Sequence, residues 1–185
     1  HEIHVRRRET HRPPVEPAAC WLPWFRRWER PFVREYPSFR WFDGGITNLA
    51  HAALDHHVAQ GRGGHAALVY ANERGERRVL TYAQLLHEVA RTAAALRGMG
   101  LGKGDRLTVY MPTCPEAIIL MLASVRIGAI HCVVFAGFGE KALGDRIVAS
   151  GSRAVFTADV TWRKGKETRL KEIVDRALAA SGEPV

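Results

Sequence analysis

The stretch from Asp105 to Phe138, DRLTVYMPTCPEAIILMLASVRIGAIHCVVFAGF, decides the fold. Its first apolar run, Leu107–Tyr110, predicts a short buried strand, and Pro112 ends that strand because proline has no N–H for a sheet hydrogen bond. The apolar run that follows predicts a helix ending at Gly128, and Ile130–Phe135 predicts a second buried strand. Two parallel strands joined by a helix leave a crevice at their carboxyl ends, where open α/β sheets bind ligands.

The rest of the chain extends this pattern in both directions. From Thr81 onward the predicted order is helix, strand, helix, strand, helix, strand, helix, with a capping box at Thr81 and Gln84 and a last helix over residues 167–180. Upstream, residues 49–59 predict a short helix, and residues 67–70 and 78–80 predict two strands around a turn. Such alternation is typical of a parallel sheet with helices on both faces, so we expect an α/β fold over residues 49–185.

The N-terminal quarter has a different composition. Residues 1–20 are basic, proline-containing and without periodicity, which predicts a flexible lead-in. Residues 21–48 are rich in aromatic side chains interleaved with arginines, typical of a platform for stacking nucleic-acid bases or of an extended arm pinned across another surface. We favour the extended aromatic arm, because no helix or strand period organises the aromatic residues.

Composition narrows the classes of partner. The net charge of +8 favours anionic partners, but the charge is spread along the chain, whereas a nucleic-acid reader usually carries a denser stripe. The longest apolar run, Ile118–Val125, is far shorter than the roughly 20 residues of a membrane span. We therefore expect neither nucleic acid nor membrane as a partner. Since the chain starts with His1, we expect it to be a piece of a longer protein.

Metal and disulfide chemistry are not indicated. The three cysteines, Cys20, Cys114 and Cys132, are widely spaced and form no CxxC pair, which fits a reducing cytoplasm. The histidines of the first predicted helix lack the three- or four-residue spacing of a helical metal pair. We expect no metal site, and no set of catalytic residues can be assembled.

Two loops follow strands at the same predicted sheet edge. One is Phe135-Ala136-Gly137-Phe138, and the other, residues 159–166, contains Arg163-Lys164-Gly165-Lys166 just before a predicted helix N-terminus. Cationic side chains and helix N-termini both attract anions, and Phe135 or Trp162 could cover an aromatic base. The pattern indicates either a site for a phosphorylated nucleotide or a solvated basic loop. Neither Gly102-Lys103 nor Gly165-Lys166 has the glycine positions of a phosphate-binding P-loop.

Several segments together resemble the N-terminal region of AMP-forming short-chain acyl-CoA synthetases, the family of acetyl-CoA and propionyl-CoA synthetases. They are WFDGGITN (41–48), YMP (110–112), RIGAIH (126–131), VVFAGF (133–138) and LKEIVD (170–175). The resemblance runs in order from about residue 24 to residue 179. It implies that residues 49–185 are the first part of the family's large domain, with a three-layer, mostly parallel flavodoxin-like sheet, and that residues 21–48 are its N-terminal arm.

The resemblance implies an acid–CoA ligase. This family uses ATP and Mg²⁺ to convert a short carboxylic acid, here acetate or propionate, to an acyl-adenylate and then transfers the acyl group to coenzyme A. The segment Arg163, Lys164, Gly165 and Lys166 matches the family's site for the 3′-phosphorylated end of coenzyme A, and Phe135, Ala136 and Gly137 match a loop that lines the nucleotide. Ala136 replaces a glycine, so its methyl narrows the approach, and Lys166 replaces an arginine, which gives up bidentate geometry.

The same comparison shows what this sequence does not contain. The family's glycine-, serine- and threonine-rich phosphate loop, acyl pocket and catalytic lysine all lie downstream of residue 185. We therefore expect this chain alone to be inactive, to hold part of the coenzyme A site, and to need the remainder of a cytoplasmic synthetase for catalysis. The alternative is a stand-alone, non-catalytic module that binds coenzyme A or another nucleotide.

Overall fold

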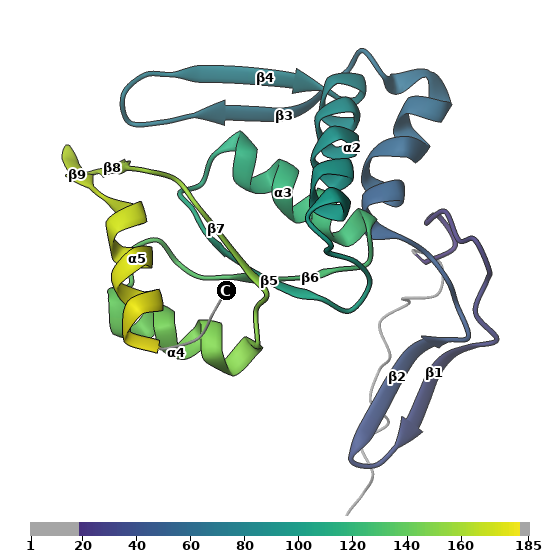
Figure 1. Cartoon of the computed structure of the whole chain (residues 1–185). Helices are drawn as coiled ribbons and strands as arrows, with labels where there is room; N and C mark the ends of the chain where they lie inside the picture. Colours follow the sequence, from purple (N-terminus) through teal and green to yellow (C-terminus); the bar gives the residue numbers. More distant parts are fainter. Residues whose placement is uncertain (1–18, 182–185) are drawn as a thin grey trace, which may run out of the picture. The chain divides into compact units, whose positions relative to one another are not determined.

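The computed structural model describes residues 19–181, which divide between Thr47 and Asn48 into two compact units (Figure 1). Nearly all of the predicted flexible lead-in, residues 1–20, lies outside the described residues. The larger unit, from Asn48 onward, holds both loops predicted to bind a ligand.

The centre of the larger unit is a three-stranded parallel sheet in the order β6-β5-β7. Its strands are β5 (Arg106–Tyr110), β6 (Ile130–Val133) and β7 (Ala154–Thr157). Helix α3 (Pro115–Arg126) connects β5 to β6, with Pro115 in its first turn, where a missing N–H costs nothing. The left-handed Gly128 (φ +79°) follows the helix, so the predicted strand–helix–strand unit is confirmed.

Helices cover both faces of this sheet. Leu107 and Val109 of β5 pack in a core with α2 and α3, whereas Tyr110 packs in a second core with α4 and α5. Successive side chains of a strand point to opposite faces, so the central strand is buried on both sides. Figure 1 shows α2 and α3 on one side of the sheet and α4 and α5 on the other. The helices are α2 (Tyr82–Gly98), α4 (Glu140–Ser150) and α5 (Leu170–Ser181).

Local signals placed two helix starts correctly. The predicted capping box is present, since the Thr81 hydroxyl accepts from the Gln84 N–H and the Gln84 side chain accepts from the Thr81 N–H. The first predicted helix is also present, over residues 49–62, but it contains two π-helical stretches. These are η1 (His51–Asp55) and η2 (Val58–Arg62).

The larger unit also contains two antiparallel hairpins, so its strands are only partly parallel. Strands β3 (Ala66–Ala71) and β4 (Arg77–Thr81) form one hairpin, and β8 (Thr161–Arg163) and β9 (Lys166–Thr168) form another, each separate from the parallel sheet. The prediction that the last helix begins at residue 167 is wrong. Residues 166–168 pair with β8 through their backbone, so α5 cannot begin until Leu170.

The smaller unit contains a two-stranded antiparallel hairpin. Strand β1 (Arg30–Glu35) pairs with β2 (Ser38–Asp43), and Phe32 lies opposite Trp41 with ring centroids 4.6 Å apart. Cross-strand aromatic pairs of this kind stabilise a hairpin. The sequence showed no strand pattern in these aromatic residues, but the structure places them on two paired strands. The aromatic residues thus contact one another across the hairpin, although several of them stay more than half exposed.

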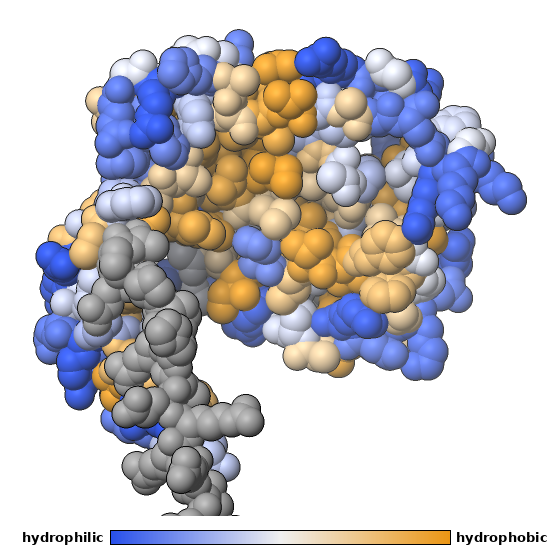
Figure 2. All heavy atoms as spheres, turned by 180° about the vertical axis from the view of Figure 1, so that it is seen from behind, coloured by the Kyte–Doolittle hydropathy of each residue, from blue (hydrophilic) through white to orange (hydrophobic). Residues whose placement is uncertain are grey.

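The larger unit also exposes apolar side chains. Val69, Val79, Ile130 and Val133 are each about half exposed, and the last two belong to the edge strand β6. Figure 2 shows apolar side chains gathered on one face. No described helix is both long enough and apolar enough to cross a membrane.

Asn48 joins the first helix to the core. Its Oδ1 accepts hydrogen bonds from the N–H groups of Ala50 (2.9 Å) and His51 (3.3 Å), which caps the helix. Its Nδ2 donates to the carbonyls of Val125 (3.0 Å) and Arg126 (3.3 Å) at the end of α3. One side chain therefore satisfies the free backbone groups of two helix ends.

We expect Asn48→Ala to lower the free energy of unfolding by about 2 kcal/mol, roughly half from the lost cap and half from the lost bonds to α3. Asn48→Ser keeps an oxygen for the cap and should lose about half as much. Urea denaturation of the three proteins measures both values, and wild-type stability in Asn48→Ala would contradict this role.

Candidate functional site

A cleft of about 930 Å³ lies at the carboxyl ends of the parallel strands. Most of its lining comes from the β3–β4 turn, the residues after β5, the loop after β6 and strand β8, with Thr168 and Ile173 added from β9 and α5. The strand–helix–strand pattern predicted a crevice at this edge of the sheet. The two hairpins form walls that the pattern did not predict.

The core fixes the loop after β6. The hydroxyl of Tyr110, a fully buried residue of β5, donates to the carbonyl oxygens of Phe138 (2.6 Å) and Ala136 (3.4 Å). The Phe138 N–H also donates to the Phe135 carbonyl (3.0 Å), which closes a turn. Burial raises the pKa of Tyr110, so the phenol keeps the proton that it donates to the loop. The loop therefore has a defined shape before any ligand binds.

Three of the predicted residues meet in the cleft. The guanidinium of Arg163 lies over the ring of Phe135, 4.9 Å from its centroid. A Cβ at Gly137 would come within 2.4 Å of the Phe135 ring and 3.0 Å of Arg163 Nη1. A side chain at position 137 would clash with this stack, so the stack requires glycine there.

Ala136 lies differently from the sequence expectation. It lines the cleft, but it also packs against the buried core that contains Tyr110 and Val134. Its methyl group therefore adds to the core. The close approach that the sequence assigned to position 136 is instead required at position 137.

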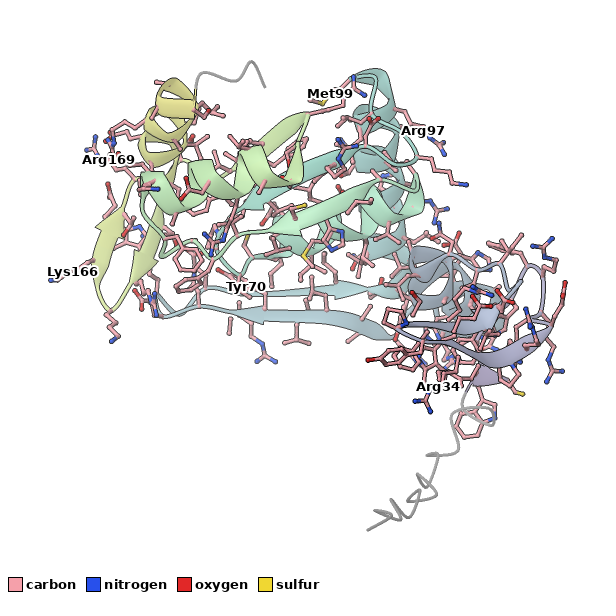
Figure 3. The ribbon with its side chains drawn as sticks, turned by 90° about the horizontal axis from the view of Figure 1, so that it is seen from below. Arg34, Tyr70, Arg97, Met99, Lys166 and Arg169 are labelled. Atoms are coloured by element: carbon pink, nitrogen blue, oxygen red, sulfur yellow. The ribbon has the colours of Figure 1, made fainter. Side chains whose placement is uncertain are left out.

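The remaining predicted residues lie on a hairpin turn. Lys164 and Gly165 connect β8 to β9, Lys166 begins β9, and none of the three lines the cleft. Figure 3 shows Lys166 at the outer edge of this hairpin. The prediction that these cations precede a helix N-terminus is wrong, because β9 lies between them and α5. The anion-attracting groups here are the cationic side chains of the hairpin.

Sequence reasoning missed two residues of the β3–β4 turn. The Glu73 carboxylate accepts hydrogen bonds from the N–H groups of Lys164 (2.8 Å) and Gly165 (3.1 Å). The Arg74 guanidinium lies 5.1 Å from the centroid of the Trp162 ring. About 90 residues separate the two turns along the chain, and no motif links them, so only the fold reveals these contacts.

The described residues show no group of three or more histidine, cysteine or acidic side chains able to hold a metal ion. The three cysteines are unpaired. Burial raises the pKa of the Cys114 thiol, which lowers its reactivity as a nucleophile. What the cleft offers is binding, through an aromatic ring and a cation stacked on it.

We expect Tyr110→Phe to leave the fold intact but to free the loop after β6. Losing the hydroxyl removes bonds worth about 1 kcal/mol, so exchange of the Phe138 amide hydrogen should become about fivefold faster. Amide hydrogen exchange measures this, with the Leu107 amide in β5 as an internal control. Unchanged exchange at Phe138 would show that the hydroxyl does not hold the loop.

Comparison with known proteins agrees with the resemblance seen in the sequence. The profile of the family described as AMP-binding enzyme matches residues 54–184. The chain is 46% identical to 3-hydroxypropionyl-coenzyme A synthetase of Metallosphaera sedula over 175 residues, which cover 91% of this chain and 26% of the relative. It is 47% identical to acetyl-coenzyme A synthetase of Deinococcus radiodurans over 156 residues, which cover 84% of this chain and 24% of the relative.

A third relative, acetyl-coenzyme A synthetase of Campylobacter jejuni, is 45% identical over 163 residues, covering 85% of this chain and 25% of the relative. The chain thus spans about a quarter of the length of the curated relatives that it matches. Because the profile matches well over half of the chain, the chain belongs to the AMP-binding enzyme family, and it corresponds to the N-terminal quarter of acetyl-CoA and 3-hydroxypropionyl-CoA synthetases.

Proposed function

We propose that this chain is the N-terminal part of an AMP-forming acid–CoA ligase and that its cleft and β8–β9 hairpin bind the nucleotide end of coenzyme A. The observation that carries the proposal is the stack of Arg163 on Phe135 beside Gly137. An aromatic ring suits a flat adenine base, and a guanidinium suits a phosphate.

The charge of the hairpin supports this assignment. Arg163, Lys164 and Lys166 lie within four consecutive residues, and no salt bridge joins any of them to an acidic side chain among residues 19–181. A phosphate group would therefore meet cationic side chains that form no ion pair among these residues, since the nearby Glu73 carboxylate binds the backbone of the turn instead. We assign Arg163 and Lys166, which flank the turn, to the 3′-phosphate, with Lys164 adding charge at the tip.

The proposed substrates follow from the family. The intact enzyme would activate a short carboxylic acid such as acetate or propionate with ATP and Mg²⁺, and the resulting adenylate would react with the thiol of coenzyme A. The residues of this chain would bind and orient the coenzyme A nucleotide, and the chemical steps would take place on the remainder of the synthetase. A cytoplasmic enzyme fits this metabolism.

The surface of the larger unit supports its being part of a larger domain. Strand β6 is an edge of the parallel sheet, and its Ile130 and Val133 are about half exposed. An exposed apolar edge strand is a pairing surface that proteins usually cover. We propose that further strands of the synthetase complete a flavodoxin-like sheet here, with residues 49–185 as its first part and residues 21–48 as an N-terminal arm.

Coenzyme A binding tests the proposal directly. We expect the 185-residue chain to bind coenzyme A about tenfold more tightly than dephospho-coenzyme A, since a charged phosphate contact is worth about 1.5–3 kcal/mol. Arg163→Ala and Lys166→Ala should each reduce this preference. Calorimetry at low salt measures the affinities.

Arg169→Ala is the matched control, because it removes one positive charge just beyond the hairpin, where Arg169 pairs with Glu172. This control should keep the preference for coenzyme A. Equal binding of the two ligands by the unmodified chain would refute the assignment of the 3′-phosphate to the hairpin.

The chain should not form an acyl-adenylate by itself, because the family's phosphate loop is absent from its sequence. We expect no release of pyrophosphate that depends on acetate or propionate when the purified 185 residues are incubated with MgATP. A coupled pyrophosphate assay measures this, and release above the level without acid would disprove the expectation.

A further inference from the structure

We infer that Glu73 is a positioning residue that holds the β8–β9 turn in the conformation that presents Arg163 and Lys166 to a phosphate. The role in ligand binding rests on the coenzyme A site proposed above. The hold on the turn is a property of the fold and can be measured without any ligand.

Both carboxylate oxygens of Glu73 contact the turn. Glu73 Oε2 accepts a hydrogen bond from the Lys164 N–H at 2.8 Å, and Oε1 accepts one from the Gly165 N–H at 3.1 Å. A carboxylate makes stronger hydrogen bonds to N–H groups than a neutral acceptor does. Because both oxygens bind successive residues, the contact restrains the orientation of the turn as well as its position.

The turn needs such support. Lys164 (φ +53°) and Gly165 (φ +70°) are both in the left-handed region, as a two-residue hairpin turn requires. Glycine adopts this conformation freely, but for lysine it is sterically disfavoured. Asparagine or aspartate is usual at the first position. The bond from the Lys164 N–H to Glu73 stabilises the backbone where the sequence is least suited to the turn.

Glu73 is itself held in place. It belongs to the β3–β4 turn, where Asn72 Oδ1 accepts hydrogen bonds from the N–H groups of Arg74 and Glu76, both at 3.0 Å. The Gly75 N–H also donates to the Asn72 carbonyl, at 3.1 Å. This network fixes the backbone on both sides of Glu73, so its carboxylate is presented from a defined turn.

The neighbouring residue makes a second contact with the same hairpin. Arg74 lies 5.1 Å from the centroid of the Trp162 ring, one residue before Arg163. Strands β8 and β9 have three residues each, and within residues 19–181 they pair with no other strand. An isolated two-stranded hairpin is marginally stable in water, so contacts from outside decide how well it is ordered.

The turn conformation sets the geometry of the phosphate ligands. Arg163 and Lys166 are paired partners in the β8–β9 register, directly before and after the turn. If the turn loses its conformation, their separation and directions change together. Glu73 would then affect phosphate binding through these two residues without touching the ligand.

Electrostatics alone predicts the opposite effect. Removing an acidic residue near a phosphate reduces repulsion and should raise affinity for an anion. Glu167 on β9 provides the matched control. It is an acidic residue of the same hairpin, but among the described residues it pairs with Arg169 and makes no side-chain hydrogen bond to the turn. Glu73→Ala and Glu167→Ala change the net charge equally, so their difference isolates positioning from charge.

The experiment combines amide hydrogen exchange with calorimetry on the 185-residue chain. In Glu73→Ala, exchange at Lys164 and Gly165 should become about tenfold faster, whereas Glu167→Ala should leave it unchanged. Coenzyme A affinity should fall about fivefold in Glu73→Ala relative to Glu167→Ala, with little change for dephospho-coenzyme A. Glu73→Gln keeps one acceptor oxygen and should partly restore both properties.

The outcomes separate this inference from the proposed function. Unchanged exchange at the turn in Glu73→Ala would overturn the hold itself, whatever coenzyme A does. Faster exchange with coenzyme A affinity equal to that of Glu167→Ala would overturn the positioning role. If the unmodified chain does not bind coenzyme A, the proposed function fails, while the exchange data still decide whether Glu73 holds the turn.

Discussion

The larger unit depends on the burial of β5 on both of its faces. Leu107 and Val109 pack toward α2 and α3, while Tyr110 packs with α4 and α5. The strand also carries the hydrogen bonds to both neighbours, β6 and β7. Two apolar cores and two strand pairings therefore share one five-residue segment, whose carboxyl end leads into the candidate site.

The candidate site has two parts. The part next to β5 is held by the buried core, and the part on the β8–β9 hairpin is held by contacts with the β3–β4 turn. The Tyr110 hydroxyl connects the buried core to the loop after β6 and so fixes the Phe135 side of the cleft. On the opposite side, the cations lie on a short hairpin whose turn is bound by Glu73. A site of this kind combines a rigid surface for a flat ring with cations whose placement depends on one carboxylate.

Local sequence signals correctly predicted those features that are determined by residues close in sequence. The capping box at Thr81 and the end of α3 at Gly128 were placed correctly, because capping and left-handed glycine are decided within one helical turn. The start of α5 was predicted wrongly, and the hairpin within the aromatic segment was not predicted. Both depend on hairpin pairing, in which backbone groups of one strand bind those of the next, and a three-residue strand such as β9 leaves almost no periodicity to detect.

The sequence by itself determined the parallel α/β pattern, the sheet edge where a ligand site was predicted, and the family to which the chain belongs. Tertiary structure alone decided that position 137, not 136, needs glycine, since the crowding comes from Phe135 and from Arg163, 26 residues later. It also brought Glu73 to the turn at Lys164 and Gly165. The physical reason is that short-range signals fix backbone conformation, whereas contacts between distant turns exist only after the sheet and its hairpins have formed.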